Sequence, residues 1–297
     1  MTPLHSLLAV TDFSAPARHA ADRAAHLAHE TGAQLTLLHA VPGSKLDELR
    51  QWLGAGHGAE QQLLKDAAER LQTLANELAT ARRVAIQAQL ATGRVLDEIA
   101  READALHADL VVLGARGAGF LRRLMLGTTS ERLLLRSTQP LLVVKQTPRG
   151  PYRRVLVAVD FSPWSAHAIE TARRVAPHAR LLLLSAFEVP FEGKLQLAGV
   201  DTQTIEHYRR QAQASARQQL DTLAHQAGLK PGHWDACVIE GDAWQRIVEQ
   251  EQEQDCDLVV LGKHGQSAAE ELLLGSVTKS VLAEGSSDVL VSVARAA

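Results

Sequence analysis

The chain of 297 residues repeats itself at a constant spacing. Asp12 aligns with Asp160, 148 positions later, and the same spacing relates other segments. LLAVTDFSAPA at 7–17 aligns with VLVAVDFSPWS at 155–165, and HADLVVLGARG at 107–117 aligns with DCDLVVLGKHG at 255–265. A constant spacing means that no net insertion or deletion separates these landmarks. Both halves must therefore fold on one backbone plan.

Each half alternates short apolar runs with amphipathic segments. Continuously apolar strands that are separated by helices indicate a parallel sheet covered on both faces. The segment TPRGPYRR between the halves contains two prolines and a glycine, which interrupt regular structure. We therefore predict an α/β protein of two tandem doubly wound, Rossmann-like domains, at 1–147 and 153–297. Each is expected to hold a five-stranded parallel sheet with helices on both faces.

The elements of the first half follow from its apolar periodicity and its glycines. A loop is expected after the second strand, where Gly54, Gly56 and Gly58 lie close together. Strands are expected at 6–12, 33–41, 84–90, 108–114 and 140–146, and helices at 15–32, 59–79, 95–105 and 130–137.

Composition excludes several functional classes. A net charge of -3 and 4% aromatic residues argue against binding to nucleic acid. No apolar run approaches about 18 residues and the amino terminus lacks a basic segment before an apolar one, so we predict no membrane association. Cys237 and Cys256 have no metal-ligand spacing. They are expected to be buried, reduced thiols in a cytoplasmic protein.

A glycine-rich stretch, GARGAGFLRRLMLGTT at 114–129, follows the fourth apolar run. In a doubly wound sheet, ligands bind beyond the carboxyl ends of the strands, where Asp12 and this stretch both fall. Gly114 and Gly117 allow a backbone to approach a ligand closely, and Gly127 precedes a helix whose amino-terminal N–H groups suit a phosphate. The alternative is that these glycines form tight turns without a ligand.

The spacing Gly-x2-Gly-x9-Gly-(Ser/Thr) occurs twice, at 114–128 and 262–276. With the matching VTDFS and VAVDFS segments, it resembles the ATP-binding signature of the universal stress protein family, over essentially the whole chain as a tandem pair. The resemblance implies that ATP binds beside the strand ends and allows magnesium to bridge its phosphates. The implied residues are Thr11, Asp12, Val41, Gly114, Arg116, Gly117, Gly127, Thr128, Thr129 and Ser130 in the first half, and Val159, Asp160, Val189, Gly262, Lys263, Gly265, Gly275, Ser276, Val277 and Thr278 in the second.

The resemblance also assigns roles within these sets. The aspartates would lie near ribose and base, and Val41 and Val189 would offer backbone to adenine. The first two glycines of each set would line ribose and phosphates, and the third, with the residues after it, would hold the phosphate tail. The last strands of family members pair across a two-fold axis. The chain would then be an internal pseudo-dimer, and a further homodimer is left open.

The two halves differ in charge within the glycine-rich stretch. Arg122 and Arg123 correspond to Glu270 and Glu271. If these side chains face phosphate, the first half attracts a polyanion and the second partly repels it; the alternative is that they are solvated surface. We favour the first half as the nucleotide site.

Enzyme signatures are missing from the sequence. There is no Gly-x4-Gly-Lys-(Ser/Thr) phosphate loop, no dinucleotide fingerprint after the first strand and no Gly-x-Ser-x-Gly elbow. His26, His29 and Glu30 are expected to be a polar helix face rather than a metal site. We therefore predict an ATP-binding stress sensor or regulator with an unknown protein partner, and a weak ATPase at most. The alternatives are an interaction protein with empty glycine turns and, less favoured, an adenylating or nucleotide-hydrolysing enzyme.

Overall fold

The computed structural model describes residues 3–53, 57–115, 128–189, 200–263 and 274–293. Its contacts divide the chain into two compact units. Unit 1 comprises Met1–Pro151 together with Asp288–Ala297, and unit 2 comprises Tyr152–Ser287. The bounds of the units come from residue contacts, whereas the domains at 1–147 and 153–297 come from the sequence repeat. The two-domain division at 1–147 and 153–297 stays a proposal.

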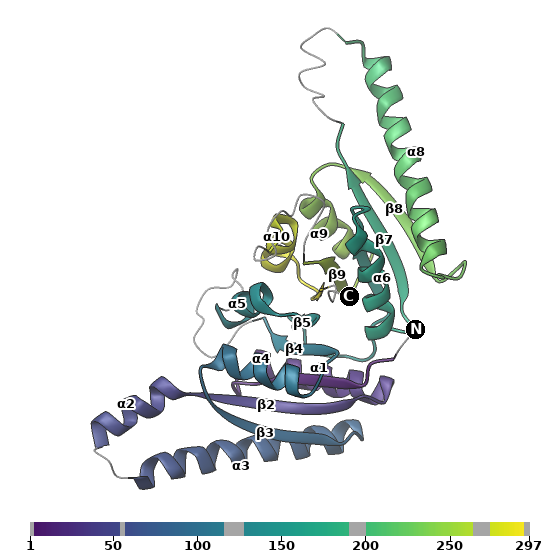
Figure 1. Ribbon diagram of the computed structural model, residues 1–297. Coiled ribbons are helices and arrows are strands. Elements are labelled where there is room, and N and C mark those ends of the chain that lie inside the picture. The colour runs from purple at the N-terminus through teal and green to yellow at the C-terminus, as the bar shows by residue number, and fades with distance from the viewer. Residues whose placement is uncertain (1–2, 54–56, 116–127, 190–199, 264–273, 294–297) are drawn as a thin grey trace. The chain divides into compact units, whose positions relative to one another are not determined.

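Unit 1 alternates strands and helices, as the sequence predicted (Figure 1). Its strands are β1 (Ser6–Val10), β2 (Gln34–Pro42), β3 (Ile86–Gly93), β4 (Leu110–Gly114), β5 (Leu141–Val144) and β10 (Asp288–Ser292). Its helices are α1 (Ala15–Thr31), α2 (Gly43–Leu53), α3 (His57–Arg82), α4 (Val95–Ala105) and α5 (Thr128–Arg136).

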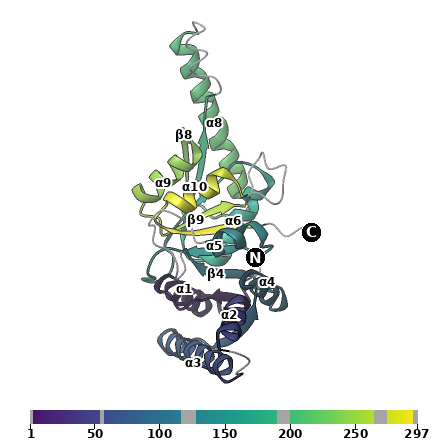
Figure 2. The ribbon, with the colours of Figure 1, turned by 90° about the vertical axis from the view of Figure 1, so that its left-hand side faces the viewer.

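The first five strands of unit 1 form a parallel sheet in the order β3-β2-β1-β4-β5. The order reverses between β1 and β4, so the carboxyl ends of these two strands flank the switch point where doubly wound folds bind ligands. Helices α1 and α3 contact each other and the strands on one face, while α4 contacts the strands and α5 on the other (Figure 2). The α/β, Rossmann-like prediction is confirmed.

The carboxyl-terminal strand β10 pairs antiparallel with β5. Its first residue, Asp288, is fully buried, and its Oδ1 accepts hydrogen bonds from the backbone N–H groups of Lys145 and Gln146. Its Oδ2 lies 3.4 Å from Nε of the buried Arg23 on α1. The Arg23 guanidinium also donates to the carbonyl of Gly150. A buried polar cluster therefore fastens β10 to β5, α1 and the segment after β5.

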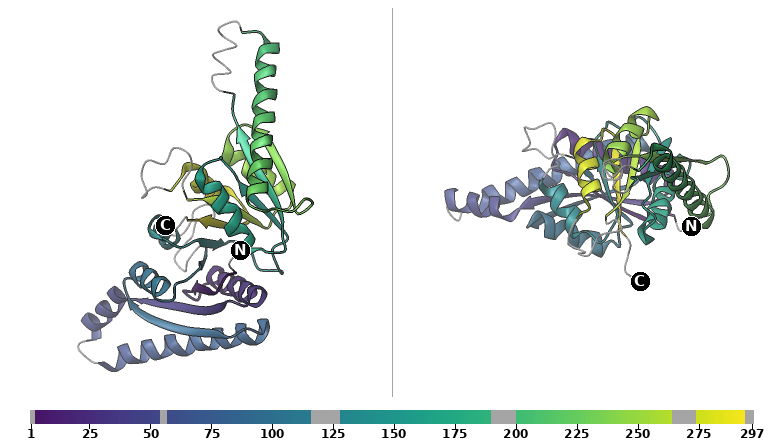
Figure 3. Two further views of the ribbon diagram at one scale, coloured as in Figure 1. Left: turned by 45° about the vertical axis from the view of Figure 1, so that its right-hand side comes forward. Right: turned by 90° about the horizontal axis from the view of Figure 1, so that it is seen from above.

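Unit 2 repeats the plan with four parallel strands in the order β8-β7-β6-β9. Helix α8 runs along β7 and β8, and α6 contacts β6 and β9 (Figure 3). Helix α9 contacts β6, β7 and α10. The elements are β6 (Arg154–Ala158), α6 (Pro163–Val175), β7 (Arg180–Phe187), α8 (Thr202–Gln226), β8 (Trp234–Glu240), α9 (Ala243–Glu253), β9 (Leu258–Gly262) and α10 (Ser276–Glu284).

An Asp-Phe-Ser turn links the first strand to the first helix of each unit. The phenylalanine has positive φ in both copies, 65° at Phe13 and 61° at Phe161. The aspartate Oδ1 accepts from the backbone N–H of the serine two residues on, at 3.0 Å in each unit. Such a bond holds the aspartate side chain against the backbone of the turn that follows the strand. The repeat in sequence is therefore a repeat in backbone conformation.

The loop predicted before residue 59 is wrong over most of its length. Helix α2 covers Gly43–Leu53, and α3 begins at His57 and includes Gly58. Gly54 and Gly56 follow α2 in the chain and so do not interrupt it. Leu46 is buried and supplies an anchor for α2, and Arg50 pairs with Asp47 one turn earlier. This helix places further side chains at the strand ends.

Candidate functional site

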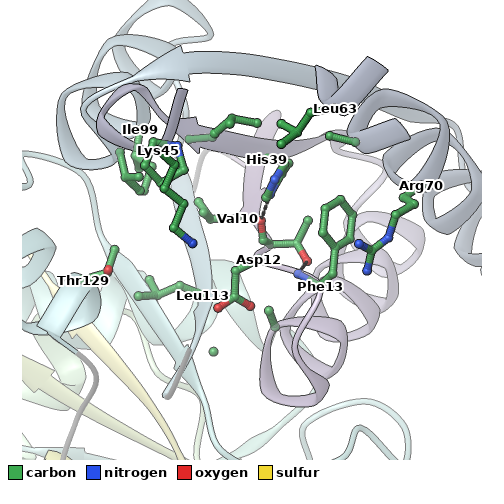
Figure 4. Close-up of a pocket in the computed structure, with 18 of the residues that line it drawn as sticks. Val10, Asp12, Phe13, His39, Lys45, Leu63, Arg70, Ile99, Leu113 and Thr129 are labelled. Atoms are coloured by element: carbon green, nitrogen blue, oxygen red, sulfur yellow. Dashed lines mark hydrogen bonds between the residues drawn. The ribbon is translucent and has the colours of Figure 1, made fainter. Parts of the chain in front are cut away.

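A cavity of about 1110 Å³ lies in unit 1 at the carboxyl ends of β1, β2 and β4 (Figure 4). Helices α2 and α3 form one wall, and the start of α5 forms another. The structure brings six predicted residues from four separate segments into this one cavity. They are Thr11, Asp12, Val41, Gly114, Thr129 and Ser130.

Gly114 ends β4 in close contact with the start of α1. A Cβ at this position would lie 2.8 Å from the carbonyl carbon and oxygen of Pro16 and 3.0 Å from the backbone nitrogen of Ala17. The buried hydroxyl of Ser130 donates to the Gly114 carbonyl across 3.1 Å. Protein packing by itself therefore requires glycine here, and the Ser130 bond ties the start of α5 to the end of β4.

An aromatic and basic group lies against the same cavity. The rings of Phe13 and His39 are 4.4 Å apart between centroids, and the guanidinium carbon of Arg70 lies 4.6 Å from the centroid of Phe13. Nδ1 of His39 lies 2.8 Å from the carbonyl oxygen of Thr11, so Nδ1 carries the hydrogen and donates it. Phe13 is thus held between an imidazole and a guanidinium at the end of β1.

The pKa of His39 is lowered from its ordinary value. Burial of the ring is the main cause, because desolvation disfavours the charged form, and Arg70 acts in the same direction. The hydrogen bond to Thr11 and the charge of Asp12 act in the opposite direction. His39 is therefore a neutral ring at pH 7 in this structure.

This shift predicts a pH dependence of stability. The unfolded chain protonates His39 near pH 6.5, whereas the folded chain does so only at lower pH. The stability due to neutral His39 is thus complete above about pH 6.5 and is lost as pH falls through the lowered pKa. Urea unfolding at about pH 7.5 and about 5.5 should show a larger loss for the wild type than for His39→Gln. An NMR pKa of His39 at or above 6.5 would contradict the argument.

His26 makes a background contribution to the pH dependence in that comparison. Burial lowers the pKa of this residue too, so it contributes to acid sensitivity in both proteins. The difference between wild type and His39→Gln therefore isolates His39, while the loss that remains in the variant is not attributable to it.

Sequence reasoning missed the wall contributed by α2 and α3. The α3 residues that line the cavity recur every three or four positions, as expected for one face of a helix. This spacing identifies the lining face of α3 once the position of the cavity is known. Lys45 lies on α2, in a stretch for which the sequence predicted a loop, so the sequence offered no reason to place it at the site. The α3 residues that line the cavity are Ala59, Gln62, Leu63, Asp66, Ala67 and Arg70.

In unit 2 a serine side chain bonds the aspartate of the turn. The hydroxyl of Ser165 donates to Oδ1 of Asp160 at 2.8 Å. The corresponding residue in unit 1 is Ala17, which has no hydroxyl. The bond from Ser165 to Asp160 therefore has no counterpart from position 17 of unit 1, although the backbone turn is the same.

The other predicted residues of unit 2 are distributed as follows. Val159 is buried after β6, Val189 is partly buried after β7, and Gly262 ends β9. Gly275 donates its N–H to the carbonyl of Lys263, whose side chain is buried, and caps α10. In α10, Ser276 is exposed, Val277 is partly buried, and buried Thr278 donates to the Gly262 carbonyl at 3.0 Å, as Ser130 does to Gly114.

Several predicted residues fall outside the described part of the chain. They are Arg116, Gly117, Gly127 and Gly265, together with the charged positions Arg122, Arg123, Glu270 and Glu271. Thr128 begins α5, but its side chain is likewise outside the description. The roles assigned to these residues remain predictions from sequence.

The described residues offer neither a metal site nor a membrane-spanning helix. They contain no group of three or more His, Cys, Asp or Glu side chains placed to hold a metal ion. They also contain no helix that is both long and apolar enough to span a membrane. Cys256 is buried, and burial raises its pKa to about 12, so its thiol stays protonated. The candidate site is the cavity of unit 1.

The universal stress protein family model matches residues 4–145 and again residues 151–292. The chain belongs to the universal stress protein family. Two matches in tandem agree with the repeat found in the sequence. The family membership predicted from the glycine signature and the Asp-Phe-Ser segments is confirmed.

Curated universal stress proteins from bacteria are similar to parts of the chain. One from Mycobacterium tuberculosis is 28% identical over 192 residues, which cover 63% of this chain and 62% of that protein. Universal stress protein G of Shigella flexneri is 33% identical over 119 residues, covering 40% of this chain and 82% of its own. The match thus spans less than two thirds of the length of the mycobacterial relative.

Solved structures match almost the whole chain. A universal stress protein from Archaeoglobus fulgidus aligns with a TM-score of 0.65 at 19% identity, over 98% of each chain. A functionally unknown protein from Pseudomonas aeruginosa aligns with a TM-score of 0.62 at 22% identity, over 97% of this chain and 92% of that one. At these identities the likeness shows the tandem fold.

Proposed function

We propose that this universal stress protein binds ATP in the cavity of unit 1 and acts as a stress-response sensor or regulator. The observation that carries the proposal is the meeting of residues from the ends of β1, β2 and β4 and the start of α5 in one cavity. These are the segments to which the family resemblance assigns the nucleotide. A volume of about 1110 Å³ leaves room for a nucleotide, since small-molecule sites commonly measure about 300–1,000 Å³.

The chemistry of the lining fits the parts of ATP. Asp12 would accept hydrogen bonds from ribose hydroxyls, and the backbone at Val41 would contact adenine. The first N–H groups of α5 would bind phosphates, because a helix start carries free donors and partial positive charge. Magnesium bound with ATP would offset part of the negative charge of the phosphates. The sequence carries neither the usual phosphate-loop lysine nor a Gly-x-Ser-x-Gly elbow, so hydrolysis is expected to be slow at most.

In this proposal ATP stabilises one conformation of the glycine-rich stretch and thereby alters a surface for a protein partner in the cytoplasm. The pairing of β5 with β10, which are the last strands of the two sequence repeats, supports an internal pseudo-dimer. Unit 2 is the weaker candidate because the Ser165 hydroxyl bonds the Asp160 carboxylate, whereas Ala17 at the matching position of unit 1 has no hydroxyl. The alternative function is an interaction protein whose glycine turns hold no nucleotide.

The test is to denature the purified protein and analyse the released small molecules by absorbance and mass. Nucleotide-free protein is then heated with and without ATP and magnesium. Released adenine nucleotide, or a rise in melting temperature that depends on ATP concentration, supports the proposal. If no adenine nucleotide is released and ATP causes no shift in melting temperature, the interaction protein becomes the better account.

A further inference from the structure

One lysine faces the cavity from outside the glycine-rich stretch. Lys45 lies in the first turn of α2 and lines the cavity. Figure 4 shows its side chain pointing toward the space between Asp12 and Thr129. Thr129 is the second residue of α5. The lysine ammonium and the amino-terminal end of α5 therefore approach the same space from different sides.

The ammonium group of Lys45 has no bonding partner within the described part of the chain. Among the residues that the structure describes, none forms a hydrogen bond or an ion pair with its ammonium. On the same helix, Arg50 is paired with Asp47 and Glu60. An ammonium that faces a cavity without a protein partner attracts an anion. Because the helix start opposite also favours negative charge, a ligand with several negative charges fits this space best.

We infer that Lys45 contacts the phosphates of the bound nucleotide and makes unit 1 selective for nucleoside polyphosphates over nucleosides. The inference rests on the proposed function and adds a residue and a selectivity to it. Phosphate loops of the usual kind carry their lysine within the glycine-rich sequence. Here α2 supplies the charge from a distant part of the chain.

The sequence repeat offers a comparison. At the spacing of 148, Gly193 aligns with Lys45 and Gln218 aligns with Arg70, and their immediate neighbours are the basic residues Lys194 and Arg217. The two halves therefore differ at the two aligned positions. This difference predicts that the phosphate contact of Lys45 is specific to the first half.

The experiment titrates ATP, AMP and adenosine into the full chain and into three variants. Lys45→Gln should weaken ATP binding about tenfold, AMP binding less, and adenosine binding less than about twofold, because only phosphate loses its charge-assisted contact. Lys45→Arg should retain most of the ATP affinity. Lys65→Gln is the matched control, since Lys65 is an exposed lysine of α3, paired with Glu69, that does not line the cavity. It should bind all three ligands like the wild type.

Salt gives a second reading of the same charge. The gap between wild type and Lys45→Gln for ATP should narrow as ionic strength rises, because salt screens an exposed ionic contact. An equal loss for ATP and adenosine, or no loss in Lys45→Gln, would overturn the inference while leaving nucleotide binding intact. If the wild type bound none of the ligands, the proposed function would fail and the inference with it.

Discussion

Replacing Asp288 with alanine is expected to lower the free energy of unfolding by about 3–5 kcal/mol, because breaking a buried ion pair leaves a buried charge without compensation. The side chains of Arg23 and Asp288 are 6% and 0% exposed. The backbone N–H groups of Lys145 and Gln146 would also lose the carboxylate oxygen that they share. Urea unfolding followed by circular dichroism measures the change.

Two further variants make this prediction specific. Asp288→Asn keeps an acceptor for the two N–H groups but removes the charge. Its free energy of unfolding should therefore lie between those of the wild type and Asp288→Ala. Glu69→Ala breaks an exposed ion pair with Lys65 in the same unit and should cost less than about 0.5 kcal/mol. A loss below about 1 kcal/mol in Asp288→Ala would show that β10 is held by its strand pairing and apolar contacts alone.

Gly114→Ala is expected to lower the free energy of unfolding by about 1–3 kcal/mol through overpacking. The added methyl would meet backbone atoms of Pro16 at 2.8 Å, and backbone cannot rotate aside as a flexible side chain can. Either α1 or the end of β4 must move. The same urea measurement applies, and ATP affinity should fall too because Gly114 lines the cavity.

Gly43→Ala is the matched control in the same unit. A Cβ at Gly43 would find its nearest neighbour, Cα of Gly93, at 3.6 Å, which is an ordinary contact. Stability should be unchanged or higher by up to about 1 kcal/mol, because alanine restricts the unfolded chain. Equal effects of the two substitutions would refute the steric explanation at Gly114.

The sequence predicted the fold because its strongest signals are local and are present twice. Apolar runs, the Asp-Phe-Ser turns and the constant spacing each depend on residues close together in the chain. The helix α2 was missed because nearby glycines outweighed the weaker helical pattern around Leu46. Glycine spacing identifies where a chain bends, but it does not fix where a helix before the bend ends.

The residues of the candidate site that lie at strand ends were predictable from the sequence. The residues that reach the site through the packing of helices were not. Asp12 and Gly114 follow apolar runs, and the switch point of the sheet brings such positions together. Lys45 and Arg70 reach the cavity only through the placement of α2 and α3, which no local pattern specifies. The sequence predicts that Gly114 lets the backbone approach a ligand, and its contact with Pro16 gives a further, purely structural reason for glycine.

The central claim is that the cavity of unit 1 holds ATP, and the most direct test is a calorimetric titration of nucleotide-free wild type, Asp12→Ala and Asp160→Ala. The two substitutions are matched, since each removes one aspartate that bonds the serine N–H of the same turn. We predict that Asp12→Ala weakens ATP binding at least about tenfold, whereas Asp160→Ala leaves it within about twofold of wild type. Unchanged ATP binding in Asp12→Ala would contradict the claim.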